Sequence, residues 1–236
     1  MPSNFIRHIV DNCLPFKQIC LFCAAAGTRH GVCAACLADL VRLPAEVCPR
    51  CAQASPFAQI CGRCLRQPPA FDVLHAALLY DYPLDGVIQA FKYGKRLDLA
   101  GSLAFLLAEL APPAIVQPDL VVAVPLADAR RMERGFNQSL ELARAFAGRI
   151  NAPLNSTLCE RIRNTPPQAR LNQRQRRHNV SHAFRVKHRV DGLCVAIVDD
   201  VATSGATLSE LALSLKKQGA KRVEAWVLAR VFYSKT

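Results

Sequence analysis

Four Cys-x-x-Cys pairs near the N-terminus constrain the fold of this 236-residue chain more than any other feature. The third and fourth pairs repeat the first two at an offset of 28 residues, which makes two copies of C-x2-C-x9-C-x2-C. Two thiolates separated by two residues can hold one ion, and two such pairs complete the tetrahedral site of structural zinc. The sequence therefore predicts two zinc ions, with the ligands Cys20, Cys23, Cys33, Cys36, Cys48, Cys51, Cys61 and Cys64.

The spacing leaves open how the four pairs combine. We favour the first pair with the second and the third with the fourth, because a duplicated unit should carry a complete site. A crossed arrangement is the alternative, and an iron–sulfur cluster is a minor alternative to zinc. The apolar runs fall short of the ~20 residues that span a bilayer, and the N-terminus lacks a signal-peptide core. We therefore expect a cytoplasmic protein that is not integral to a membrane, in which thiolates stay free to bind metal.

The composition changes at about residue 70, where apolar strands begin to alternate with amphipathic helices. The order of these elements predicts an α/β fold with a parallel sheet flanked by helices over residues 70–236, after a small cysteine-rich zinc-ribbon region over residues 1–69. Residues 125–136 are expected to form a loop. The expected strands are 73–80, 120–124, 193–198 and 223–228, and the expected helices are 84–93, 137–148, 207–218 and one that begins at residue 98.

One strand-to-helix connection carries residues suited to a phosphorylated sugar. Small residues in its loop let main-chain N–H groups approach a phosphate, and the helix N-terminus adds partial positive charge. The two acids before them suit the cis hydroxyls of a ribose or a nearby magnesium ion. An ordinary acidic turn is the alternative, but adjacent acids at the end of a buried strand are costly without a partner. The predicted binding residues are Asp199, Asp200, Val201, Ala202, Thr203, Ser204, Gly205, Ala206 and Thr207.

This segment resembles the signature of type I phosphoribosyltransferases, which is an apolar strand, two acids and then Thr-Ser/Thr-Gly-x-Thr. The resemblance implies a type I phosphoribosyltransferase-like domain with a five-stranded parallel sheet, and phosphoribosyl pyrophosphate with Mg²⁺ as the ligand. By the same resemblance, Asp199 and Asp200 hold the ribose hydroxyls and residues 203–207 hold the 5′-phosphate. The 6-oxopurine enzymes of that family have an Asp at the position of Thr203, so the chain departs from that subclass.

A narrower resemblance covers nearly the whole chain and adds a DNA-related role. After the cysteine pairs come Phe91-Lys92-Tyr93, Val124-Pro125, Arg134-Gly135-Phe136-Asn137-Gln138, Arg177-His178-Asn179-Val180 and Val198-Asp199-Asp200. These motifs are similar to those of the ComF family of competence-associated proteins. The resemblance implies a role in DNA uptake and natural transformation, or in the use of DNA as a nutrient, with incoming single-stranded DNA as the partner.

Basic residues add to both expectations. Arg134 and Asn137 follow a strand end, where they can serve a pyrophosphate group, and Lys92 is a further candidate donor, although each also suits an ordinary surface position. Residues 158–189 carry nine Lys or Arg and one acid, which is +8 of the net charge of +12. This favours an anionic partner such as single-stranded DNA, with a lid over the sugar phosphate and a solubilising loop as the alternatives. The predicted nucleic-acid or lid residues are Arg163, Arg170, Arg174, Arg176 and Arg177.

Three functions agree with these features. The favoured one is a protein that binds phosphoribosyl pyrophosphate and single-stranded DNA. The second is an active phosphoribosyltransferase of nucleotide salvage, which releases pyrophosphate and whose acceptor base no residue identifies. The third is a scaffold whose ribbons dock a protein of the DNA-uptake machinery.

Overall fold

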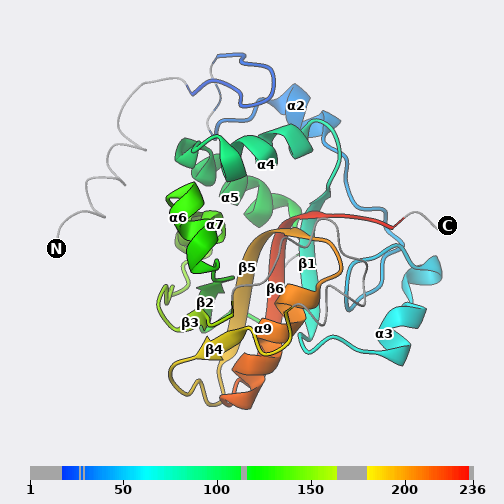
Figure 1. The fold of residues 1–236 in the computed structure, drawn as a ribbon. Coiled ribbons are helices and arrows are strands. Elements are labelled where there is room, and N and C mark those ends of the chain that lie inside the picture. The colour runs from blue at the N-terminus through cyan, green and yellow to red at the C-terminus, as the bar shows by residue number, and fades with distance from the viewer. Residues whose placement is uncertain (1–17, 27, 29, 113–115, 164–179, 234–236) are drawn as a thin grey trace. The chain divides into compact units, whose positions relative to one another are not determined.

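The computed structural model describes residues 18–26, 28, 30–112, 116–163 and 180–233 (Figure 1). The chain divides into two compact units, Met1–Asp39 and Leu40–Thr236. The first unit contains the first four cysteines of the repeat, and the second contains the other four together with the sheet. The domain boundary that we expect after residue 69 stays a prediction.

The larger unit is built on a parallel sheet (Figure 1). Its strand order is β1-β6-β5-β2, and every neighbouring pair runs parallel. Residues 195–198 are apolar and buried on both faces of the sheet, which is typical of a central parallel strand. The strands are β1 (Val73–Leu79), β2 (Leu120–Ala123), β5 (Cys194–Ala202) and β6 (Arg222–Arg230).

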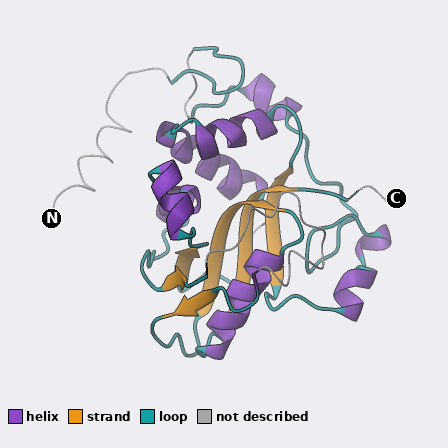
Figure 2. Ribbon diagram, viewed as in Figure 1, coloured by secondary structure: helices purple, strands orange, loops and turns teal. Residues whose placement is uncertain are grey.

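Helices cover both faces of this sheet (Figure 2). Helices α5 (Ala100–Leu110) and α7 (Gln138–Arg149) pack on one face, and α9 (Ala206–Lys217) packs on the other. Helix α4 (Leu84–Tyr93) follows β1, and the 3-10 turn η2 (Leu97–Leu99) leads into α5. Strands β3 (Cys159–Arg161) and β4 (Phe184–Val186) form a separate antiparallel pair, and β4 packs against α9. The predicted α/β fold with a parallel sheet and flanking helices is confirmed.

The sheet has fewer strands than the phosphoribosyltransferase resemblance implies. The described residues contribute four strands to it, whereas the resemblance implies five. Leu154 forms a single parallel bridge with Val121 at the free edge of β2. At the place where a fifth strand would pair with β2, the described residues therefore form this single bridge only.

The predicted loop over residues 125–136 is wrong in part. It contains helix α6 (Asp128–Arg134), which ends at Gly135 in a left-handed conformation with a φ of 79°. Ala, Arg, Met and Glu are good helix formers, and they outweigh the loop signals of the flanking Pro125 and Gly135.

The strand predicted over residues 193–198 is longer than expected. It continues to Ala202 because β6 pairs with it as far as Arg230. Asp199 and Asp200 therefore lie within the strand, and its hydrogen bonds to β6 fix their main chain.

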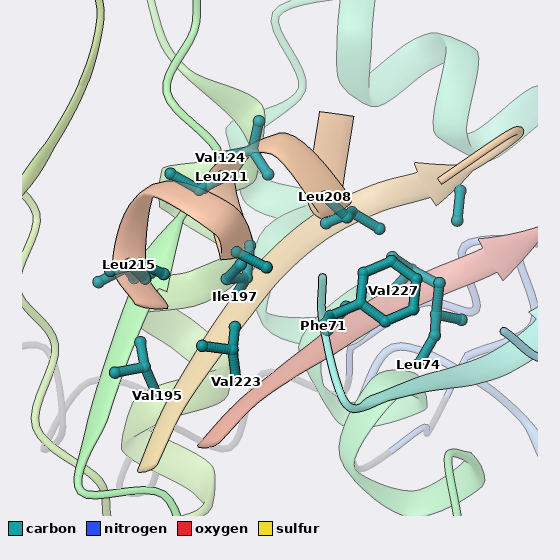
Figure 3. Close-up of a cluster of buried hydrophobic side chains, with 14 of the residues drawn as sticks. Phe71, Leu74, Val124, Val195, Ile197, Leu208, Leu211, Leu215, Val223 and Val227 are labelled. Carbon is teal, nitrogen blue, oxygen red and sulfur yellow. The ribbon is translucent and has the colours of Figure 1, made fainter. Parts of the chain in front are cut away.

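The core on the α9 face joins that helix to the two central strands (Figure 3). Leu208, Leu211 and Leu215 pack against Ile197 of β5 and Val223 of β6. Leu211 is fully buried, and truncation of such a side chain to Ala costs about 2–5 kcal/mol. This packing fixes the position of α9, and hence of its N-terminus, against the end of β5.

The second cysteine region shares this core. Cys48, Cys51 and Cys64 belong to the same buried cluster as Phe71. The region has two short helical elements, η1 (Pro56–Ala58) and α3 (Gly62–Arg66). A few large apolar side chains cannot stabilise such a short region alone, so its attachment to the sheet supplies part of its stability.

The smaller unit is described here by itself. Its described residues include a short helix, α2 (Ala34–Asp39), and an isolated antiparallel bridge between Gln18 and Thr28. Across both units, the part of the chain that the structure describes has no helix of the length and apolar character needed to cross a membrane.

Candidate ligand-binding site and metal centres

Two adjacent carboxylates stand near the carboxyl end of β5, at the sheet edge where parallel α/β folds bind ligands. Asp200 is 4% exposed, and its Oδ1 lies 3.1 Å from Nζ of Lys92 on α4. Its other oxygen, Oδ2, is buried and has no hydrogen-bond partner among the described residues. Lys92 therefore offsets part of the free-energy cost of burying this acid. One buried acceptor of Asp200 remains without a hydrogen-bond partner among the described residues.

Asp199 has partners on a different helix. Oγ of Ser139, at the start of α7, donates to Oδ1 of Asp199 at 2.7 Å, and the main-chain N–H of Asp200 donates to the same oxygen at 3.0 Å. Burial and the charge of Asp200 raise the pKa of Asp199 to about 7, against the lowering effects of Ser139 and Lys92. This carboxyl group therefore exchanges its proton near neutral pH, as groups at binding sites often do.

Lys92 stays charged between the two acids. Burial acts to lower the pKa of Lys92, but the carboxylates of Asp200 and Asp199 outweigh it, so the pKa is raised. The predicted ligand residues Lys92, Asp199 and Asp200 thus form one charged cluster.

The loop after the acids opens helix α9. Its last residue, Gly205, is the N-cap of α9 and has a φ of 73°, a left-handed conformation that favours glycine. A Cβ at Gly205 would lie 3.6 Å from the ring of Phe71 beneath it. Oγ of Ser204 accepts a hydrogen bond from the main-chain N–H of Ala206 at 3.3 Å. A 12-residue helix begins here, so its partial positive charge lies next to the acid pair.

Two other predicted ligand residues have partners within the protein. The guanidinium of Arg134 lies over the ring of Tyr93, 4.6 Å from its centroid, and donates to the Tyr93 hydroxyl at 3.2 Å. Asn137 caps α7, because its Oδ1 accepts from the main-chain N–H of Ser139 and its Nδ2 donates to the carbonyl of Val124 at 3.1 Å. Asn137 therefore positions the serine that holds Asp199. The roles of Arg134 and Asn137 in ligand binding stay predictions.

The eight predicted metal ligands form two clusters, with the pairing that we favour from the sequence. In each cluster the four sulfur atoms lie within 4.8 Å of one another. The sulfur atoms of Cys23 and Cys33 are 3.7 Å apart, and so are those of Cys51 and Cys61 at the equivalent positions. A tetrahedral site with Zn–S bonds of about 2.3 Å has sulfur atoms about 3.8 Å apart. Both clusters can therefore hold a zinc ion.

Main-chain donors support the sulfur atoms in the same way in both clusters. The N–H of Cys33 donates to Sγ of Cys20 at 3.4 Å, and the N–H of Cys61 donates to Sγ of Cys48 at 3.3 Å. A bound zinc ion would supply folding free energy to each region.

The second cluster adjoins the loop. Arg63 lies between two of its ligands on α3, and its Nη1 donates to the carbonyl of Ser204 at 3.0 Å. Arg230, the last residue of β6, donates through Nε to the carbonyl of Cys51 at 3.0 Å. Its Nη1 donates to the carbonyls of Ala202, at 2.8 Å, and of Thr203.

The basic segment falls only in part within the described residues. Arg163 is exposed and donates to the carbonyl of Ser181. Glu160 pairs with Arg185 and Lys187, so two of the cations have a local counter-charge. The other predicted nucleic-acid or lid residues lie outside the described residues, namely Arg170, Arg174, Arg176 and Arg177.

Four residues around the site are not predicted from the sequence: Ser139, Arg63, Arg161 and Arg230. Burial and Arg130 lower the pKa of Arg161, whereas the Asp199 carboxylate acts to raise it, so the charge of this arginine interacts with Asp199. Arg230 could have been recognised from the sequence, because it is a charged residue at the end of an apolar strand. Ser139 and Arg63 could not, since a serine in the first turn of a helix and an arginine in a zinc ribbon are both common.

No family model matches the chain. Among solved structures, it is similar to a purine phosphoribosyltransferase from Pyrococcus horikoshii, with a TM-score of 0.34 and 19% identity over 61% of this chain and 85% of that one. It is also similar to the glutamine phosphoribosylpyrophosphate amidotransferase of Bacillus subtilis, with a TM-score of 0.41 and 20% identity over 59% of this chain and 30% of that one. Similarities at these TM-scores and identities do not support a conclusion about the activity of this chain.

The relatives in sequence are much closer. The DNA utilization protein YhgH of Salmonella typhimurium is 36% identical over 225 residues, which cover 92% of this chain and 99% of that protein. Competence protein F of Haemophilus influenzae is 31% identical, over 86% of this chain and 91% of that protein. Competence protein ComFC of Bacillus subtilis is 25% identical, over 91% and 95%. With its two four-cysteine clusters, its parallel α/β sheet and relatives that match along nearly their whole length, the chain belongs to the ComF family of DNA utilization and competence proteins.

Proposed function

We propose that this protein binds phosphoribosyl pyrophosphate with Mg²⁺ at the β5–α9 loop, binds single-stranded DNA through its basic segment, and acts in the uptake or use of DNA. The observation that carries the first part is the acid pair at the end of β5. Lys92 holds Asp200 and Ser139 holds Asp199, directly before a loop that opens α9. Replacement of a buried ion pair by apolar residues is often neutral for stability, so the buried Asp200 beside the half-buried Asp199 indicates a role beyond the fold.

The chemistry of the site suits a phosphorylated ribose. Asp199 and the unpartnered Oδ2 of Asp200 can accept hydrogen bonds from two cis hydroxyls. The N-terminus of α9 and the hydroxyl of Ser204 lie on the next residues of the chain, where they can receive the 5′-phosphate. Mg²⁺, when bound with the ligand, neutralises the charge of the pyrophosphate group.

The charge of the basic segment and the names of the sequence relatives support the proposal that the protein binds DNA. Residues 158–189 carry nine Lys or Arg against the single acid Glu160, which leaves a formal charge of +8. A basic surface binds single strands mainly through their phosphates, with little sequence preference. Two of the relatives are named for DNA utilization and for competence, and the first name gives DNA as what that protein uses.

Two measurements on the purified protein test this function. Thermal unfolding should shift upward with phosphoribosyl pyrophosphate and Mg²⁺, because ligand at a hundred times its Kd adds about 2.7 kcal/mol to the free energy of unfolding. Fluorescence anisotropy should show binding of a labelled 20-mer of single-stranded DNA. Absence of both responses would contradict the proposal.

A pyrophosphate-release assay, scanned over free bases and oligonucleotides, separates binding from turnover. We expect binding without release. Release with one acceptor would instead identify the protein as an active phosphoribosyltransferase, which is the alternative function.

A further inference from the structure

Two arginines hold three consecutive carbonyl groups of the β5–α9 loop. Arg230 donates to the carbonyls of Ala202 and Thr203, and Arg63 donates to the carbonyl of Ser204. Carbonyl oxygens repel a phosphate, so a phosphate-binding loop must turn them away from its ligand. The arginines bind these carbonyl oxygens on the side of the second cysteine region. The N–H groups of the loop are then available to the ligand.

Both arginines are attached to the second cysteine cluster. Arg63 lies on α3 between the ligands Cys61 and Cys64. Arg230 donates from Nε to the carbonyl of the ligand Cys51 at 3.0 Å. Each arginine therefore connects the metal-binding region to the loop through a single side chain.

The charge of these arginines has no other partner in the described part of the structure. Arg230 is fully buried, and no carboxylate among the described residues forms an ion pair with Arg230 or Arg63. A buried guanidinium without a counter-charge is strongly unfavourable. A zinc ion with four thiolates has a formal charge of about −2, which matches the two arginines. Without metal, the segment that carries Arg63 and the segment that presents the carbonyl of Cys51 are no longer joined through a common ion.

We propose that metal in the second cysteine cluster holds the phosphate-binding loop in its binding conformation, through Arg230 and Arg63. One consequence of this inference, a gain in affinity for phosphoribosyl pyrophosphate, rests on the proposed function. Its structural part, that metal in this cluster orders residues 203–207, does not depend on the ligand. The first cluster has the same ligand spacing but lies in the other compact unit, so it provides a matched control.

The first experiment removes one metal at a time from the full chain. Cys61→Ser in the second cluster and Cys33→Ser at the equivalent position of the first should each remove about one zinc ion, as measured by metal analysis. Hydrogen exchange of residues 203–209, measured without ligand, should become faster in Cys61→Ser and stay unchanged in Cys33→Ser. The affinity for phosphoribosyl pyrophosphate with Mg²⁺ should fall about tenfold or more in Cys61→Ser only, which is the effect of losing one charge-assisted hydrogen bond.

The second experiment leaves both metal sites intact, in case Cys61→Ser does not fold. Arg63→Gln removes the charge and the bond to Ser204, and we expect two zinc ions, faster exchange of residues 203–209 and weaker ligand binding. Arg66→Gln, an exposed arginine on the same helix, should match the wild type. The inference is overturned if Arg63→Gln exchanges and binds like the wild type. If the wild type binds no phosphoribosyl pyrophosphate, the proposed function fails, and the exchange data alone decide whether metal orders the loop.

Discussion

Lys92 Nζ lies 3.1 Å from Oδ1 of Asp200, which joins helix α4 to the carboxyl end of β5 at the centre of the candidate site. The lysine is mostly buried, and its charge compensates two neighbouring acids. This ion pair is therefore part of the fold as well as of the site, and its removal should affect both stability and ligand binding.

Replacement of Lys92 should destabilise the protein in a pH-dependent way. Lys92→Met leaves the buried Asp200 and the half-buried Asp199 without their cation, and breaking a buried pair in this way costs about 3 kcal/mol. The loss should be larger at pH 8, where Asp199 is ionised, than at pH 5, where it is protonated. Urea unfolding at the two pH values measures the difference. Lys95→Met, at an exposed position just after α4, is the control and should change stability little. Equal losses at both pH values would contradict this account of the pair.

The raised pKa of Asp199 predicts how stability varies with pH. Between its ordinary value of 3.8 and about 7, folded Asp199 keeps a proton that the unfolded chain has lost. The contribution of Asp199 to the free energy of unfolding is therefore fully present at low pH and falls as the pH rises through this range. The melting temperature of Asp199→Asn relative to the wild type should thus increase from pH 5 to pH 8. A constant difference across this range would argue against a raised pKa.

The same group predicts the pH dependence of binding. A ligand that carries Mg²⁺ requires the ionised carboxylate, so its affinity should rise by up to about tenfold per pH unit below pH 7 and level off above it. Ser139→Ala removes a hydrogen bond that lowers this pKa, and should move the midpoint of the profile to higher pH. Calorimetry in buffers of different ionisation enthalpy would detect the released proton directly.

Metal analysis of protein purified without chelator should find about two zinc ions per chain, one for each cluster of four sulfur atoms. Iron with inorganic sulfide in place of zinc would point to iron–sulfur clusters. A value near zero in natively folded protein would show that the cysteines do not bind metal.

The basic segment should bind single-stranded DNA through phosphates. Each phosphate contact contributes about −0.7 to the slope of log affinity against log salt concentration. Replacement of Arg174, Arg176 and Arg177 together should therefore flatten the slope by about two units. If DNA binding is unchanged while the affinity for phosphoribosyl pyrophosphate collapses, the segment serves the sugar-phosphate site as a lid. Loss of both affinities would indicate one site shared by the two ligands.

Local sequence patterns predict the helices and strands of this fold well, because the residues that determine each element are close to one another in the sequence. Helix α4 has the predicted bounds, and α9 begins and ends within one residue of its predicted bounds. The cysteine spacing predicts which sulfur atoms share a site, since each repeat forms a closed unit. Helix α6 is not predicted, because Pro125 and Gly135 indicate a loop on either side of good helix formers.

Contacts between distant residues are the part that the sequence does not predict. The bond of Ser139 to Asp199 spans 60 residues, and that of Arg63 to Ser204 spans 141. No periodicity or spacing rule connects such pairs, because they depend on how whole elements pack. The acid pair itself was recognisable, since two charges at the end of an apolar strand require partners, but the identity of those partners came from the structure.

The most direct test of the central claim is titration calorimetry with phosphoribosyl pyrophosphate and Mg²⁺ on the wild type and on the Asp199→Asn, Asp200→Asn double variant. We predict that the wild type binds one equivalent and that the double variant shows no binding, because the hydroxyls of the ribose lose both carboxylate acceptors. The exposed substitution Asp98→Asn should bind like the wild type. Unchanged binding by the double variant would place the ligand elsewhere and contradict the account.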